Sequence, residues 1–221
     1  MNLEKLFNVR NLQHWQWPEQ SKLDAVFIPG RAEGNWEDSY GGSNDGLLSL
    51  AGDHNDLYRY IVIPGSDGSY SISGRRFPTG YPGWREWKEN ICRQGIPEHR
   101  VLLTLGHGLN TRTETDDFVS LAKGKGWTSG AVFMNQHETL RVMLGVLKSF
   151  EIAGHRMKIY PVTPRAEWDR VIYGSQGQKQ MPRALHILEE FSRVVTYQKK
   201  GDLASFEELE TYYKEVLAVD W

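Results

Sequence analysis

The stretch LDAVFIPG, residues 23–30, decides the fold, because it is the first of five short apolar runs of one form. The others are YRYIVIPG, RVLLTLGHG, SGAVFMNQ and HRMKIYPV. Most are rich in Val, Ile, Leu and Phe and most stop at Gly or Pro, which is typical of strands buried on both faces. Each run is therefore expected to be a strand.

The segments between these runs have helical periodicity. Their apolar faces are Trp84, Trp87 and Ile91; Phe118, Leu121 and Ala122; and Leu140, Leu144 and Leu147. Strands that alternate with helices need crossover connections, so we predict an α/β fold with a mostly parallel sheet and helices on both faces. The last part of the chain, 163–221, has further helical stretches and is predicted to be a C-terminal helical extension.

Composition limits the class of protein. A chain of 221 residues favours a single domain, 1–221. The formal net charge of −2 comes without a basic block, which disfavours nucleic acid as the main partner. The N-terminus lacks the apolar core of a signal peptide and no stretch is long enough to span a bilayer, so we expect a cytoplasmic protein with no membrane partner. The single cysteine, Cys92, has no evident base beside it and is expected to be an inert core residue.

The stretch HGLNTRTETDDF, residues 107–118, has two interpretations. One is a capping box, with Thr111 as the N-cap and Glu114 reaching back to it. This does not require His107, Asn110 or Arg112, which lie where a strand end meets a helix N-terminus. Backbone N–H groups at such a place can hold an anion, so a ligand site is the second interpretation.

The stretch FMNQHETLR also follows a strand. His137 and Arg141 are four residues apart and share a helical face. The unperturbed pKa of histidine lies near neutrality, so His137 is a candidate general acid or base, and Arg141 could pair with a carboxylate or phosphate. The alternative is an ordinary helix start.

Two glycine loops, IPGRAEG and IPGSDG, end the first two strands. Gly30 and Gly65 would let the backbone approach a ligand, followed by Arg31 in one loop and by Ser66 and Asp67 in the other. Otherwise both are plain turns. The longer segments that contain them, 30–46 and 65–83, are predicted to be loops. The chain lacks G-x-G-x-x-G, G-x-x-x-x-G-K-[ST] and H-E-x-x-H, which disfavours classical NAD binding, P-loop chemistry and a metal site.

The order of these motifs resembles the YdcF/SanA/ElyC family, a domain of unknown function with a Rossmann-like fold. The resemblance covers residues 23–150 and implies a Rossmann-like three-layer core over 23–162. It implies site roles for Glu86 before GIP, for Asn110, Thr111 and Glu114 of the box NTRTE, and for His137 and Arg141. The cofactor is left open, with S-adenosylmethionine or a nucleotide implied as a ligand.

Three functional hypotheses follow. In the first, the protein is a hydrolase or transferase that acts on a nucleotide-like or phosphorylated small molecule. His137 would be the general acid or base, and Glu86 or Glu114 would orient it or a water. The anionic groups would be held by Arg31, Asn110, Thr111 and Arg141. In the second, the same site binds a nucleotide or S-adenosylmethionine without turnover, and in the third the site is vestigial and the tail binds another protein.

Overall fold

All five apolar runs form one parallel sheet in the computed structural model, as predicted. The structure describes residues 22–30, 44–72, 75–78, 81–105, 110–164, 168–173 and 180–217. The strands are β1 (Leu23–Phe27), β2 (Tyr58–Ile63), β5 (Val101–Leu103), β6 (Ser129–Phe133) and β7 (Lys158–Val162). Their order is β5-β2-β1-β6-β7, and every neighbouring pair is parallel. The predicted α/β, Rossmann-like fold is therefore confirmed.

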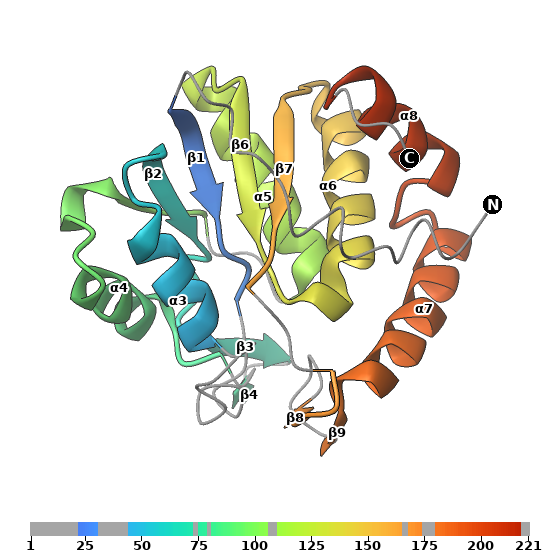
Figure 1. The fold of residues 1–221 in the computed structure, drawn as a ribbon, viewed down its shortest axis with the longest axis horizontal. Helices are drawn as coiled ribbons and strands as arrows, with labels where there is room; N and C mark the ends of the chain where they lie inside the picture. The colour runs from blue at the N-terminus through green and yellow to red at the C-terminus, as the bar shows by residue number, and fades with distance from the viewer. Residues whose placement is uncertain are drawn as a thin grey trace.

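Two layers of helices enclose this sheet (Figure 1). One face is covered by α3 (Asn44–Asp53) and α4 (Trp84–Arg93), and the other by α5 (Thr111–Lys125) and α6 (Thr139–Ala153). Successive residues of a strand point to opposite faces. Ala25 and Phe27 accordingly pack with α5 and α6, whereas Val26 and Ile28 pack with α3 and α4. Because both faces are buried, the strands are mostly apolar, and their polar residues lie toward their amino ends.

The C-terminal part adds a third cover to the α6 side of the molecule (Figure 1). It contains β8 (Val171–Tyr173), β9 (Gln180–Pro182), α7 (Arg183–Lys199) and α8 (Phe206–Glu215). Tyr212 anchors α8, since its hydroxyl donates to Met157 O at 2.8 Å and accepts from Ile159 N at 2.7 Å. Helix α6 is thus covered on most sides, which explains why almost all of 141–150 is buried and not only the predicted stripe.

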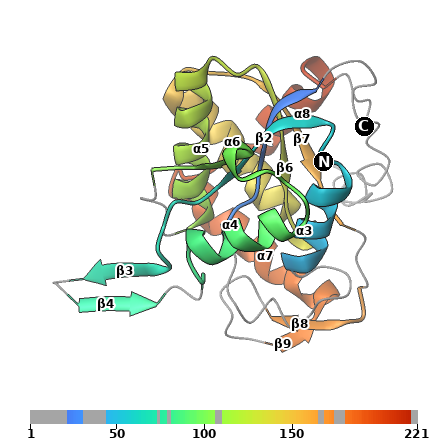
Figure 2. The ribbon, with the colours of Figure 1, turned by 90° about the vertical axis from the view of Figure 1, so that its left-hand side faces the viewer.

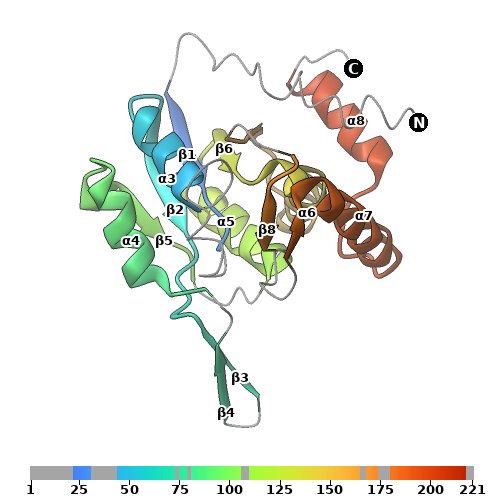
Figure 3. The same cartoon turned by 60° about the horizontal axis from the view of Figure 1, so that its bottom comes forward.

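Two small hairpins lie at the end of the sheet where the parallel strands terminate (Figures 1 and 2). Strands β3 (Ser69–Ile72) and β4 (Arg75–Pro78) pair antiparallel and project from the body of the molecule (Figure 3). Strands β8 and β9 form the other hairpin. The interpretation of 65–83 as a plain loop was therefore wrong for β3 and β4. Short 3₁₀ helices η2 (Glu98–Arg100) and η3 (Gln136–Glu138) complete the fold. Among the described helices, none has the length and apolarity that crossing a membrane requires.

Candidate functional site

The carboxyl ends of β1 and β6 mark the point where the strand order reverses. These strands are neighbours, yet β1 leads toward α3 on one face and β6 leads into α6 on the other. The chain segments that follow the two strands therefore run to opposite faces of the sheet. Such a position is called the topological switch point, and ligands of open parallel sheets bind in the crevice outside it. Gly30 follows β1 and His137 follows β6 here.

Glu114 crosses from α5 to the end of β1. Its carboxylate, in a residue only 8% exposed, accepts a hydrogen bond from Gly30 N at 3.1 Å. A Cβ on residue 30 would lie 3.0 Å from Glu114 Oε1 and 3.4 Å from Tyr81 Cδ2, so glycine permits this close approach. Burial, and then the negative charge of Glu114, raise the pKa of Tyr81. The neutral Tyr81 hydroxyl donates to Pro64 O at 3.1 Å.

The N-cap of α5 is Asn110, so the prediction that Thr111 caps this helix with Glu114 was wrong. Asn110 has extended backbone angles, and its side-chain oxygen accepts from Arg112 N at 3.0 Å and Thr113 N at 3.2 Å. Thr113 completes the box by accepting from Asn110 N. This shift of one residue leaves Glu114 available for Gly30. The Asn110 side chain also occupies two backbone N–H groups, those of Arg112 and Thr113, that could otherwise have held an anion at this helix end.

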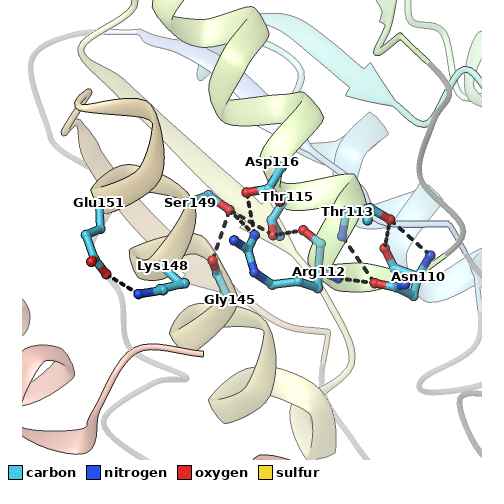
Figure 4. Close-up of polar contacts among 9 residues, drawn as sticks. All are labelled: Asn110, Arg112, Thr113, Thr115, Asp116, Gly145, Lys148, Ser149 and Glu151. Carbon is cyan, nitrogen blue, oxygen red and sulfur yellow. Dashed lines mark hydrogen bonds and ion pairs between the residues drawn. The ribbon is translucent and has the colours of Figure 1, made fainter. Parts of the chain in front are cut away.

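Arg112 links α5 to α6 (Figure 4). Its guanidinium donates to Asp116 on its own helix and to Ser149 Oγ on α6 at 2.8 Å. The single hydroxyl hydrogen of Ser149 has two acceptors within reach, Thr115 Oγ1 at 3.1 Å and Gly145 O at 3.0 Å. Arg112 therefore stabilises the contact between two helices.

The loop after β2 packs against the start of α4. Gly65 N donates to Thr104 Oγ1 at 3.3 Å, and the buried Ser66 accepts from Gly68 N at 3.2 Å. Asp67 is exposed and, with Glu86 of α4, lines a surface hollow of about 430 Å³. The other lining residues are Pro82, Gly83, Trp84, Arg85, Glu89 and Arg93. Asp67 and Glu86 are thus brought together, but at α4 and not at the end of β6.

Five consecutive polar residues, 135–139, are buried where β6 ends. Asn135 is 4%, Gln136 8% and His137 5% exposed. Asn135 Nδ2 donates to Glu138 Oε2 at 3.3 Å. The His137 ring lies beside His186 of α7, with ring centroids 5.6 Å apart. His137 is therefore enclosed between the sheet edge and the C-terminal extension.

Arg141 is engaged by carboxylates of the protein itself. Its Nε donates to Glu190 of α7, and its Nη2 lies 3.7 Å from Glu138 Oε1. Burial alone would lower the pKa of Arg141, but the charges of Glu190 and Glu138 raise it overall. Glu190 also accepts from Arg193 at 2.5 Å. The extension thus supplies the main counter-charge of the predicted anion-binding arginine.

The predicted site residues consequently fall into three groups. Gly30 and Glu114 meet at the switch point, with Asn110 and Thr111 at the start of the same helix; Gly65, Ser66, Asp67 and Glu86 lie near α4; His137 and Arg141 lie under α7. Arg31 and His107 lie outside the described residues. The sequence interpretation took Asn135 only as a possible helix cap with Glu138, and it did not single out Gln136 or Tyr81. The polar pair NQ directly after a buried strand was the signal that could have marked Asn135 and Gln136 as site residues.

Together, the sheet and these residues define a Rossmann-like α/β protein with polar side chains at the carboxyl ends of its parallel strands. No protein-family model matches the chain, and the search of curated proteins found no match. Among solved structures, a weak similarity links it to the PlmKR1 ketoreductase from the first module of phoslactomycin biosynthesis in Streptomyces sp. HK803. The TM-score is 0.35 at 12% identity, over 83% of this chain and 40% of that chain. This chain therefore spans well under half of the length of that ketoreductase.

No group of three or more His, Cys, Asp or Glu side chains placed to hold a metal ion occurs in the described part of the chain. Cys92 is half-buried on α4. Burial, and then the charge of Glu98, raise the pKa of its thiol, which lowers the thiolate fraction at neutral pH.

Proposed function

We propose that this protein is a YdcF-like enzyme that binds a nucleotide-like or phosphorylated small molecule and catalyses its hydrolysis or a group transfer. The observation that supports this is that a carboxylate and an imidazole lie at the carboxyl ends of two neighbouring strands, β1 and β6. Glu114 is held against Gly30 at the end of β1, and His137 follows the neighbouring strand β6. A buried carboxylate and an imidazole at adjacent strand ends are the groups that acid–base catalysis uses.

Each residue has a role in this proposal. His137 transfers the proton, and the Glu114 carboxylate orients a water or a ligand hydroxyl. Arg141 positions the η3 segment, because Glu138 and Glu190 already meet its charge. The anionic part of the ligand falls to Arg31, which follows Gly30 in the sequence.

The test begins with a thermal-shift screen of nucleotides, sugar nucleotides, S-adenosylmethionine and phosphorylated metabolites, because a ligand of the folded state raises its Tm. Compounds that bind are then incubated with the protein, and products are separated by chromatography. His137→Ala should abolish turnover and keep binding. His99→Ala is the matched control, because His99 is exposed and lies in η2, which directly precedes the amino end of β5 and not the carboxyl end of a strand. A screen with no binder, or turnover that survives in His137→Ala, would contradict the proposal.

A binding protein without turnover is the second candidate. The burial of His137 beneath α7, with its ring beside that of His186, favours it. Such a protein would bind a compound from the screen and leave it unchanged on prolonged incubation, whichever histidine is present.

A further inference from the structure

Within the described part of the chain, several buried polar atoms that lack a hydrogen-bond partner lie at the carboxyl ends of β6 and β7. They are Asn135 Oδ1, both Oε1 and Nε2 of Gln136, and Thr163 Oγ1. Asn135 and Gln136 are more than nine-tenths buried. We refer to these three residues, two with side-chain amides and one with a hydroxyl, as the amide cluster.

The strand register places the members of this cluster near one another. Phe133 of β6 pairs with Val162 of β7, and Met134 N donates to Val162 O at 3.1 Å. Asn135 and Thr163 therefore leave the ends of two paired strands. Gln136 lies in η3, which packs against α7. The amide cluster thus lies at the sheet edge on which the proposed function depends.

Unpaired amides in a protein interior are costly, because they lose their bonds to water and gain none. Buried donors and acceptors are therefore almost always paired with protein, water or ligand. The amide of Gln136 offers one acceptor and two donor hydrogens side by side. Its complement is a planar group with an adjacent donor and acceptor, such as the edge of a nucleobase. All three side chains are uncharged, so they suit a neutral group better than a phosphate.

We propose that the amide cluster recognises the nucleobase of the ligand, with Gln136 pairing to the base edge and Asn135 and Thr163 bonding beside it. This inference rests on the proposed function and narrows it. The ligand then carries a nucleobase, and a phosphorylated sugar without a base binds more weakly.

The test is calorimetric titration of the full chain with AMP, GMP, CMP, UMP and ribose 5-phosphate. We expect at least one nucleotide to bind about tenfold more tightly than ribose 5-phosphate, as one or two buried hydrogen bonds imply. Gln136→Met should lose this preference. Gln94→Met, a matched change at an exposed glutamine that ends α4, should keep it. Without ligand, Gln136→Met should melt no lower than the wild type, because the change removes unpaired polar atoms while filling the same volume.

Thr163→Val is a second variant of nearly the same shape, which keeps the test valid if Gln136→Met fails to fold. Equal binding of nucleotides and ribose 5-phosphate to the wild type would overturn the inference and leave the proposed function standing. The inference would also be overturned if both Gln136→Met and Thr163→Val kept the preference for a nucleotide over ribose 5-phosphate. A Gln136→Met variant with a lower Tm and an unchanged preference would overturn it as well. A broad screen without any binder would overturn both.

Discussion

Breaking the buried ion pair between Arg141 of α6 and Glu190 of α7 should cause a large loss of stability. The two side chains are 9% and 5% exposed, so water cannot replace a lost partner. Removing one member of a buried pair costs about 3–5 kcal/mol, because the other charge stays buried. In Glu190→Gln, Arg141 keeps Glu138 at 3.7 Å, so we expect the lower end, about 3 kcal/mol. For a chain of this length, Tm should fall by about 6–12 °C.

Urea unfolding followed by circular dichroism measures this loss directly. The control is Glu210→Gln, which breaks the exposed pair between Glu210 and Lys214 and should cost less than about 1 kcal/mol. If Glu190→Gln loses no more stability than Glu210→Gln, α7 is not held on α6 by this ion pair.

Four other variants and sites test separate parts of the structure. Gly30→Ala places a Cβ 3.0 Å from Glu114 Oε1 and should cost about 1–3 kcal/mol in urea unfolding, whereas Gly124→Ala, with nothing within 4 Å, should not destabilise; equal effects would refute the close contact. Asn110→Ala removes the N-cap of α5 and should cost about 0.5–2 kcal/mol, while an unchanged midpoint would show that another residue caps the helix. Tyr212→Phe leaves Ile159 N and Met157 O without their partner and should cost about 1–3 kcal/mol by the same assay. The raised pKa of Cys92 means that its alkylation rate should rise to half-maximum at a higher pH than that of free cysteine; a midpoint at or below the free value contradicts this.

The positions of the five parallel strands were predictable because each strand is a run of consecutive, mostly apolar residues. LDAVF and its counterparts are apolar on both alternating faces, and only a doubly covered sheet buries both. The helix faces containing Trp87 and Phe118 were predictable for a similar local reason. Strands β3 and β4 were missed because serine, glycine and arginine dominate 69–78, and the alternation SYSI is too short to outweigh them.

The candidate site was less predictable, because its contacts join distant residues. Glu114 and Gly30 are 84 positions apart, and the choice of Asn110 over Thr111 as N-cap depends on the backbone angles with which the chain enters α5. A sequence allows either residue to cap, since both are good N-caps. Only the three-dimensional arrangement shows that the one-residue shift releases Glu114 for Gly30.

The C-terminal extension changes how the end of β6 should be understood. The resemblance covers residues 23–150, yet Glu190 and His186, which lie against Arg141 and His137, come from α7. An arginine whose charge is already met attracts an anion weakly, so we expect Arg141 to add little to anion binding while α7 is in place. Because α7 is tied to the same arginine, a movement of α7 away from α6 would expose His137 and take Glu190 from Arg141, which would keep Glu138 at 3.7 Å. Ligand access and anion binding at this edge are therefore expected to change together.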